Sequence, residues 1–282
     1  MKRTLSAKRT LSAKRTLSAI CLLSALAVLQ PPPASGQAVF RSTQAANLPT
    51  AAMLQSGNWL FEISHRFDTP VSNGASDFWG LDGPVWNRMG LTFTPHERLM
   101  LSVLRSNRLD NVELNAKFVG VSVASESLPM EIAAQGGIAW NTDVFVTAGA
   151  TDNEMQAYVQ VIANALVLDR LALGVVPTFL RNPRILDVDA ETAFAVGLNG
   201  QYYFNDTWSF LGEWVVSEER PGLEYDSGTF GFEIRTRGHF FKLLVTNQAS
   251  TSPTQVLAGS PNDFTDPDVW RLGFNITRLL PF

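Results

Sequence analysis

The chain has 282 residues, of which 45% are hydrophobic and 17% are charged, and its formal net charge is −4. The length is enough for one large domain. The negative balance argues against nucleic-acid binding, which requires a basic surface.

The first 38 residues have the three parts of a secretory signal peptide. Lys-Arg-Thr-Leu-Ser-Ala occurs at 2–7, 8–13 and 14–19 and supplies six positive charges, and an apolar run over 17–29 follows. A small-residue stretch then ends at Ala38, which is the expected cleavage site, with Gly36 as the alternative. The apolar run is shorter than the roughly 20 residues of a membrane-spanning helix. The sequence therefore predicts export.

The expected mature chain is acidic and contains no cysteine. Cys21 is the single cysteine and lies in the apolar run, after Ile20, whereas a lipoprotein signal requires a small residue there. Removal of six basic residues leaves 16 Lys and Arg against 26 Asp and Glu, a net charge of −10. Disulfides, thiolate metal ligands and a cysteine nucleophile are thereby excluded.

Residues 39–56 lack periodicity and are predicted to form a short periplasmic lead-in. From Gly57 to the end, apolar and polar residues alternate with a period of two, which predicts strands rather than helices. Twelve strands are predicted near 57–67, 84–94, 98–106, 111–122, 129–140, 154–168, 170–180, 192–204, 207–217, 227–236, 239–248 and 268–280.

The connections between these strands favour a barrel over a β-sandwich. Short turns alternate with long polar segments at 68–83, 141–153, 181–191, 218–226 and 249–267, although 107–110 is short for an outer loop and 123–128 is long for a turn. Long loops at one end and short turns at the other are typical of outer-membrane barrels. The fold class predicted for residues 57–282 is therefore all-β: a closed antiparallel transmembrane β-barrel with periplasmic termini.

The last strand carries its own signal. Leu280 and the final residue, Phe282, keep the outward phase of an alternating strand whose outward side chains are mostly apolar. A terminal strand that ends in an aromatic residue resembles the signal that outer-membrane barrels present to their assembly machinery. We therefore expect Phe282 to act as an assembly signal.

Three short segments resemble a bacterial family, the β-barrel domain of unknown function numbered fifty-seven seventy-seven. They are Phe61-Glu-Ile-Ser-His-Arg-Phe67, Trp79-Gly-Leu-Asp82 and Arg88-Met-Gly-Leu91, and Arg105-Ser106 follows. Trp79 stands where the family pattern has Phe. The resemblance implies a barrel in the outer membrane and no established activity.

Candidate catalytic groups are sparse. The three histidines, His65, His96 and His239, are not spaced as metal ligands with a carboxylate, and Ser64 and His65 face opposite sides of a strand. Neither a metal nor a cofactor is expected. Asp82 is the one loop candidate for binding a ligand, although an Asp turn before Gly83 explains it more simply.

The inward phase of the strands is rich in charge of both signs. A lining of one sign would indicate a selective pore, whereas a balanced lining favours pairing across a narrow lumen. The predicted lumen charges are Glu62, Arg66, Arg88, Glu113, Lys117, Glu213, Glu233, Arg235, Lys242 and Arg271. For Glu62, the neighbouring cations offered by adjacent strands are Arg88 and Arg271.

Three functional hypotheses follow from these patterns. The first is a narrow channel or transporter for small solutes. The second is a non-conducting structural or interaction barrel with a salt-bridged lumen and functional outer loops. The third and weakest is a membrane-embedded enzyme, so we expect no enzymatic activity. The expected partners are outer-membrane lipid and the barrel-assembly machinery, while the solute and the oligomeric state stay open.

Overall fold

The computed structural model describes residues 38–125, 127–143, 154–183, 185 and 191–280. These residues belong to one compact unit that spans 35–282. The predicted signal peptide up to residue 37, including Cys21, and the predicted assembly signal Phe282 lie outside the described residues.

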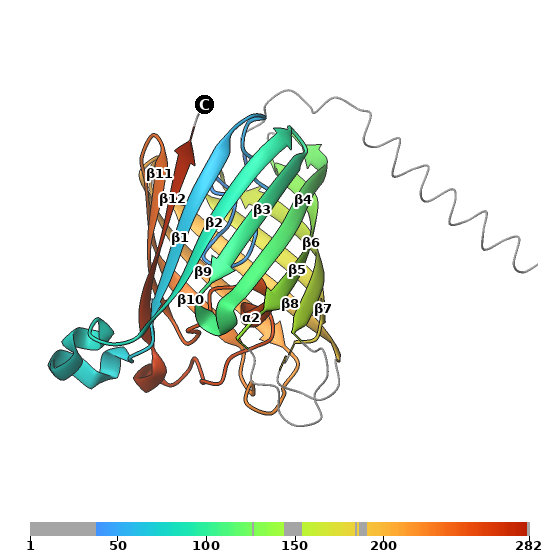
Figure 1. The fold of residues 1–282 in the computed structure, drawn as a ribbon. Coiled ribbons are helices and arrows are strands. Elements are labelled where there is room, and N and C mark those ends of the chain that lie inside the picture. The colour runs from blue at the N-terminus through green and yellow to red at the C-terminus, as the bar shows by residue number, and fades with distance from the viewer. Residues whose placement is uncertain (1–37, 126, 144–153, 184, 186–190, 281–282) are drawn as a thin grey trace, which may run out of the picture. The chain divides into compact units, whose positions relative to one another are not determined.

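Twelve antiparallel strands in the described residues form one closed barrel (Figure 1). Each strand pairs with its neighbours in sequence, and β1 pairs with β12 to complete the ring. The strands are β1 (Trp59–Phe67), β2 (Val85–His96), β3 (Leu99–Ser106), β4 (Asn111–Val123), β5 (Met130–Asn141), β6 (Met155–Val167), β7 (Leu171–Arg181), β8 (Thr192–Tyr203), β9 (Trp208–Ser217), β10 (Ser227–Arg235), β11 (His239–Thr246) and β12 (Arg271–Leu280). The predicted strand boundaries agree with these bounds to within three residues, so the predicted closed antiparallel barrel of twelve strands is confirmed.

Alternating side chains explain why these segments form a barrel. Along β1 every second residue is buried, and the buried set is Leu60, Glu62, Ser64 and Arg66. The opposite phase carries large apolar side chains that stay exposed, such as Met89, Phe179 and Leu243. An apolar outer surface around a polar interior is the pattern of a barrel that spans a membrane. No helix among the described residues is long and apolar enough to do so.

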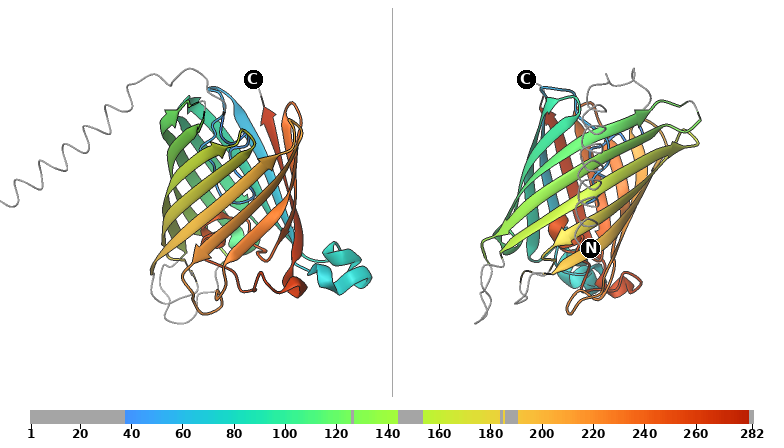
Figure 2. Two further views of the ribbon diagram at one scale, coloured as in Figure 1. Left: turned by 180° about the vertical axis from the view of Figure 1, so that it is seen from behind. Right: turned by 90° about the vertical axis from the view of Figure 1, so that its right-hand side faces the viewer.

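The two ends of the barrel differ. We call the end where β1 begins and β12 stops the terminal end, and the opposite end the loop end. Short turns join the strands at the terminal end, and longer segments join most of them at the loop end (Figures 1 and 2). The loop end carries three short 3-10 elements, η1 (Val71–Gly80), η2 (Arg108–Asp110) and η3 (Pro267–Val269), and one short helix, α2 (Pro253–Val256).

Two segments fold back into the barrel and fill it. Residues 39–52, which we call the plug segment, enter from the terminal end, and Val39, Phe40, Leu48 and Thr50 are almost fully buried. Residues 249–260, which we call the inner loop and which contain α2, enter from the loop end and are buried nearly throughout. Figure 2 shows the plug segment, in dark blue, inside the ring of strands.

This placement differs from the periplasmic lead-in expected over 39–56 and from the exposed loop expected over 249–267. The physical reason is that the barrel interior is polar. Segments rich in Ser, Thr, Gln and Asn can be buried there because the inward side chains satisfy their hydrogen bonds. Leu48 of the plug segment and Leu257 of the inner loop belong to one apolar cluster, which is where the two segments converge.

Candidate functional site

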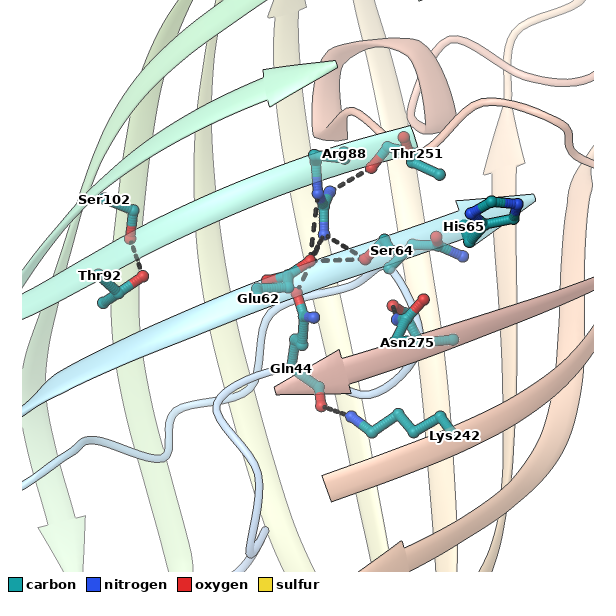
Figure 3. Close-up of polar contacts among 12 residues, drawn as sticks. Gln44, Glu62, Ser64, His65, Arg88, Thr92, Ser102, Lys242, Thr251 and Asn275 are labelled. Atoms are coloured by element: carbon teal, nitrogen blue, oxygen red, sulfur yellow. Dashed lines mark hydrogen bonds and ion pairs between the residues drawn. The ribbon is translucent and has the colours of Figure 1, made fainter. Parts of the chain in front are cut away.

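The candidate functional site is the interior of the barrel, where inward charges bind the plug segment. Eight of the ten predicted lumen charges are buried, and they comprise four acids and four bases: Glu62, Glu113, Glu213, Glu233, Arg66, Arg88, Lys117 and Lys242. Figure 3 shows part of this network around Glu62 and Arg88.

Glu213 on β9 holds the tip of the plug segment. The plug turns back on itself over 43–50, with Thr50 N–H donating to Thr43 O at 3.1 Å. At the tip, the N–H groups of Ala46, Asn47 and Leu48 donate to the Glu213 carboxylate at 2.6, 2.8 and 2.7 Å. Successive N–H groups that converge in this way form a concave anion site. The carboxylate is therefore stabilised by peptide N–H groups of the plug.

Two lysines bind the carbonyl groups of the same segment. Lys117 Nζ on β4 donates to Thr50 O at 2.8 Å and to Ala52 O at 2.7 Å. Lys242 Nζ on β11 donates to Gln44 O at 2.6 Å, to Ser42 Oγ at 3.0 Å and to Ala45 O. The plug is thus held by charge-assisted hydrogen bonds from three sides of the wall.

Arg66 and Asn275 add further hydrogen bonds to the tip. Arg66 Nη2 donates to Asn47 Oδ1 at 2.9 Å, and Asn275 Nδ2 donates to Ala46 O at 2.6 Å. Arg66 also donates to Asn275 Oδ1 at 2.8 Å. A Cβ atom at Gly273 would lie 2.6 Å from Arg66 Cδ, so only glycine leaves room for the arginine to cross β12.

Arg88 connects the barrel wall with both inserted segments. Its guanidinium pairs with Glu62 and donates to Thr251 O of the inner loop. It also donates to Gln44 Oε1 of the plug segment at 3.3 Å (Figure 3). The predicted pairing of Glu62 with Arg88 is therefore present, and Arg88 contacts both the plug segment and the inner loop.

The remaining buried acids bind wall residues. Glu113 accepts from Tyr158 Oη at 2.7 Å and from Asn115 Nδ2 at 3.1 Å. Glu233 lies 3.3 Å from Lys242 Nζ and accepts from Gln201 Nε2 at 2.8 Å. Glu113 has no hydrogen bond to the plug segment among the described residues, which makes it a useful comparison for Glu213.

Arg235 and Arg271 keep the predicted inward phase but lie at opposite mouths of the barrel. Arg235 is exposed at the terminal end. Arg271 at the loop end lies 4.0 Å from Asp68 and donates to the Asp68 and Val269 carbonyls at 2.8 Å. The expectation that Arg271 approaches Glu62 is corrected, because β12 places Thr277 opposite Glu62, six residues further along.

Asp82 lies outside this interior. It is exposed in the loop after β1, and its N–H donates to Asp77 O at 3.1 Å, as expected of a turn residue. The described residues contain no group of three or more His, Cys, Asp or Glu that could hold a metal ion.

Little space is left beside the plug near Glu62 and Arg88. A cavity of about 50 Å³ lies between the plug segment and the wall, and Gln44, Glu62, Arg88 and Lys117 line it. This is room for water and not for a solute. The plug segment therefore leaves no passage for a solute at this height of the lumen.

Sequence reasoning identified the wall charges but not the backbone groups of the plug segment that bind Glu213, Lys117 and Lys242. One signal was available. Residues 39–56 contain Arg41 as their sole charged residue, and residues 243–262 contain none. Solvated linkers and outer loops are usually richer in charge.

The comparisons with known proteins agree with this architecture. The family model of a membrane-bound β-barrel domain (DUF5777) matches residues 40–280, which include the plug segment. Among curated proteins, none matches the sequence. Three solved structures, one outer-membrane channel and two porins, resemble this chain at low identity.

An outer-membrane channel from Pseudomonas putida F1 is 12% identical with a TM-score of 0.51, and the match covers 82% of this chain and 98% of that one. The NanC porin is 6% identical with a TM-score of 0.47, covering 80% and 99%. The KdgM porin is 8% identical with a TM-score of 0.48, covering 78% and 98%. These likenesses concern the fold alone.

Proposed function

Because this chain belongs to the family of membrane-bound β-barrel domains, we propose that it is a narrow channel for small polar solutes, closed by its own plug segment. The observation that carries the proposal is the way Glu213, Lys117 and Lys242 bind the plug through backbone groups. Water can replace peptide N–H and C=O groups as partners of these charges.

The composition of the plug supports its role as a removable part. Arg41 is its one charged residue. Of the wall charges that contact the plug, Lys242, Arg66 and Arg88 also have partners on the wall. When the plug leaves, four acids and four bases line a hydrated interior, as in a polar pore. A permanently filled barrel would gain more from an apolar filling, since buried charges require compensation.

The attachment of the plug also suits a gate. With cleavage after Ala38, the plug is the free start of the mature chain and is joined to the barrel only through residues 53–58. The ladder between β1 and β12 closes the ring without it. The plug can therefore leave the lumen without breaking any strand pairing.

The proposed orientation follows from the export signal and from the loop lengths. The terminal end, with its short turns, faces the periplasm, and the loop end faces outward from the outer membrane. Phe282 is proposed as the contact for the assembly machinery. The proposal includes no catalytic step and no cofactor.

A second candidate is a non-conducting structural barrel. The specific observation in its favour is the second closure by the inner loop, whose Thr251 carbonyl binds Arg88. Under this candidate the loops at the outer end carry the function.

Deletion of residues 40–52 separates the two candidates. Purified wild-type and deleted proteins are inserted into planar bilayers, after heat-modifiable gel mobility confirms that both barrels are folded. A channel closed by its plug predicts brief openings of the wild type and a steady current through the deleted protein. If neither protein conducts although both are folded, the second candidate holds.

A further inference from the structure

A second cavity lies at the terminal end, between the plug segment and the wall formed by β10, β11 and β12. Its volume is about 300 Å³, and its lining includes Arg41, Ser42, Arg235, Arg237, Phe240 and Thr277. We call it the terminal pocket. It adjoins the small cavity beside Glu62, with which it shares Thr43 and Leu60, and it has about the minimum volume of a small-molecule site.

Three arginines line this pocket, and no carboxylate lies among its lining residues. Arg235 ends β10, Arg237 lies in the tight turn between β10 and β11, and both line the pocket. Arg41 comes from the plug. Its ion pair with Asp206 is 3.3 Å long, but Asp206 is 96% exposed, so solvent screens the pair.

Two buried acids next to the pocket are already committed to other groups. Glu62, opposite Thr277 in the pairing of β1 with β12, pairs with Arg88. Glu233, two residues before Arg235, binds Lys242 and Gln201 deeper in the lumen. Three guanidinium groups around one pocket repel each other unless an anion lies between them. Arginine presents a planar fork of N–H donors that suits carboxylate and phosphate oxygens.

An independent observation comes from Thr277 on β12. This residue is 2% exposed and lines the pocket, and its Oγ1 has no hydrogen-bond partner among the described residues. A buried hydroxyl without a partner is unfavourable, and native structures usually supply one. The Thr277 hydroxyl can donate to an oxygen atom of a bound anion.

We propose that the terminal pocket binds a small phosphate-bearing anion, with Arg41, Arg235 and Arg237 as its cationic ligands and Thr277 as a hydroxyl donor. Several oxygens and more than one negative charge are needed to match three guanidinium groups, and a phosphate group supplies both. The pocket volume accommodates inorganic phosphate or a small phosphate monoester.

Such an anion bridges the plug and the wall. Arg41 belongs to the plug segment, whereas the other three ligands belong to the barrel. Binding therefore stabilises the closed plug, and this consequence rests on the proposed function. Binding of the anion does not rest on the proposed function, because the pocket is present while the plug is seated.

Binding is tested by titration calorimetry on the full mature protein in phosphate-free detergent solution, with inorganic phosphate and glycerol phosphate as separate probes. For the probe that binds more tightly, Arg235→Gln/Arg237→Gln should lower the affinity by at least about tenfold, and Thr277→Val should lower it by a smaller factor. Arg278→Gln is the matched control, because Arg278 adjoins Thr277 but is exposed in the outward phase and should leave affinity unchanged.

The two probes distinguish the source of the phosphate. Tighter binding of glycerol phosphate indicates an ester ligand, and equal binding indicates phosphate alone. Absence of binding for both probes, or an equal loss in the Arg278→Gln control, overturns the proposed site.

The effect on the plug is measured on the Ala51→Cys variant by the rate at which a small maleimide labels the buried thiol. The phosphate probe should slow maleimide labelling of the Ala51→Cys protein severalfold. It should not slow labelling when Arg235→Gln/Arg237→Gln is combined with Ala51→Cys. Binding with an unchanged labelling rate refutes the bridging role but leaves the site. A protein that never conducts yet binds phosphate through these arginines refutes the proposed function alone.

Discussion

Glu213→Gln should release the plug while the barrel stays folded. The carboxylate accepts N–H groups from Ala46, Asn47 and Leu48 and the side-chain amide of Asn47, at 2.6 to 3.1 Å. A glutamine keeps one oxygen, but its NH₂ group then faces donors of the plug and leaves at least one of them without a partner.

The magnitude follows from hydrogen-bond energies. Leaving one buried N–H unpaired costs about 1–3 kcal/mol, and each bond that loses its charged acceptor is weakened by roughly 1 kcal/mol. A total of about 3 kcal/mol raises the ratio of released to seated plug roughly 100-fold. The free energy of unfolding of the barrel should change much less, since Glu213 accepts its hydrogen bonds from residues 46–48 of the plug segment.

The assay is maleimide labelling of Ala51→Cys, whose side chain is 2% exposed when the plug is seated. Glu113→Gln is the matched control, because it removes the same charge from the same wall at a site bonded to Tyr158 and Asn115. Labelling should accelerate strongly with Glu213→Gln and little with Glu113→Gln. Equal acceleration by both variants would refute the reasoning.

Three further changes probe other parts of the closure. Leu48→Ala removes a buried side chain from the cluster shared with the inner loop, so the seated state of the plug should be destabilised by about 2–5 kcal/mol. Trypsin should then cleave faster at Arg41, while the folded barrel keeps its mobility on an unheated gel. Slow cleavage would show that packing at Leu48 contributes little. Glu62→Gln leaves Arg88 without its carboxylate and should lower the unfolding free energy in urea by about 3 kcal/mol, with little change in ion selectivity. A selectivity shift at unchanged stability would instead indicate a wide, hydrated lumen. Deletion of Phe282 should reduce the amount of assembled protein in cell envelopes much more than it changes the stability of the barrel that does assemble, and wild-type assembly would contradict its role as a signal.

The barrel was predictable because its determinants are local. A period of two along each strand fixes which side chains point inward, so Glu62, Arg88, Glu113 and Lys117 were identified from spacing alone. Alternation of short and long connections then indicated closure. Membership of the family agrees with both inferences.

The plug and the inner loop were not predictable in the same way, because their partners are distant in sequence. Ala46 and Glu213 are separated by 167 residues, and no periodicity records their contact. Hydropathy also fails here, since a segment buried in a polar lumen has the composition of an exposed loop. The same reason explains the error over Arg271, whose phase was predicted but whose height in the barrel depends on the register of β12.

A reducible tether tests the central claim that the plug segment is the gate. Ala51 of the plug and Ala133 of β5 lie in one apolar cluster, and the expected mature chain has no cysteine of its own. Ala51→Cys/Ala133→Cys, joined by oxidation or by a short dithiol reagent, fixes the plug in the lumen. Single-channel recording should show no openings while the tether is intact and a return of openings after reduction, whereas each single cysteine variant should conduct in both conditions. Openings of equal size and frequency with the tether intact would contradict the claim that the plug closes the channel.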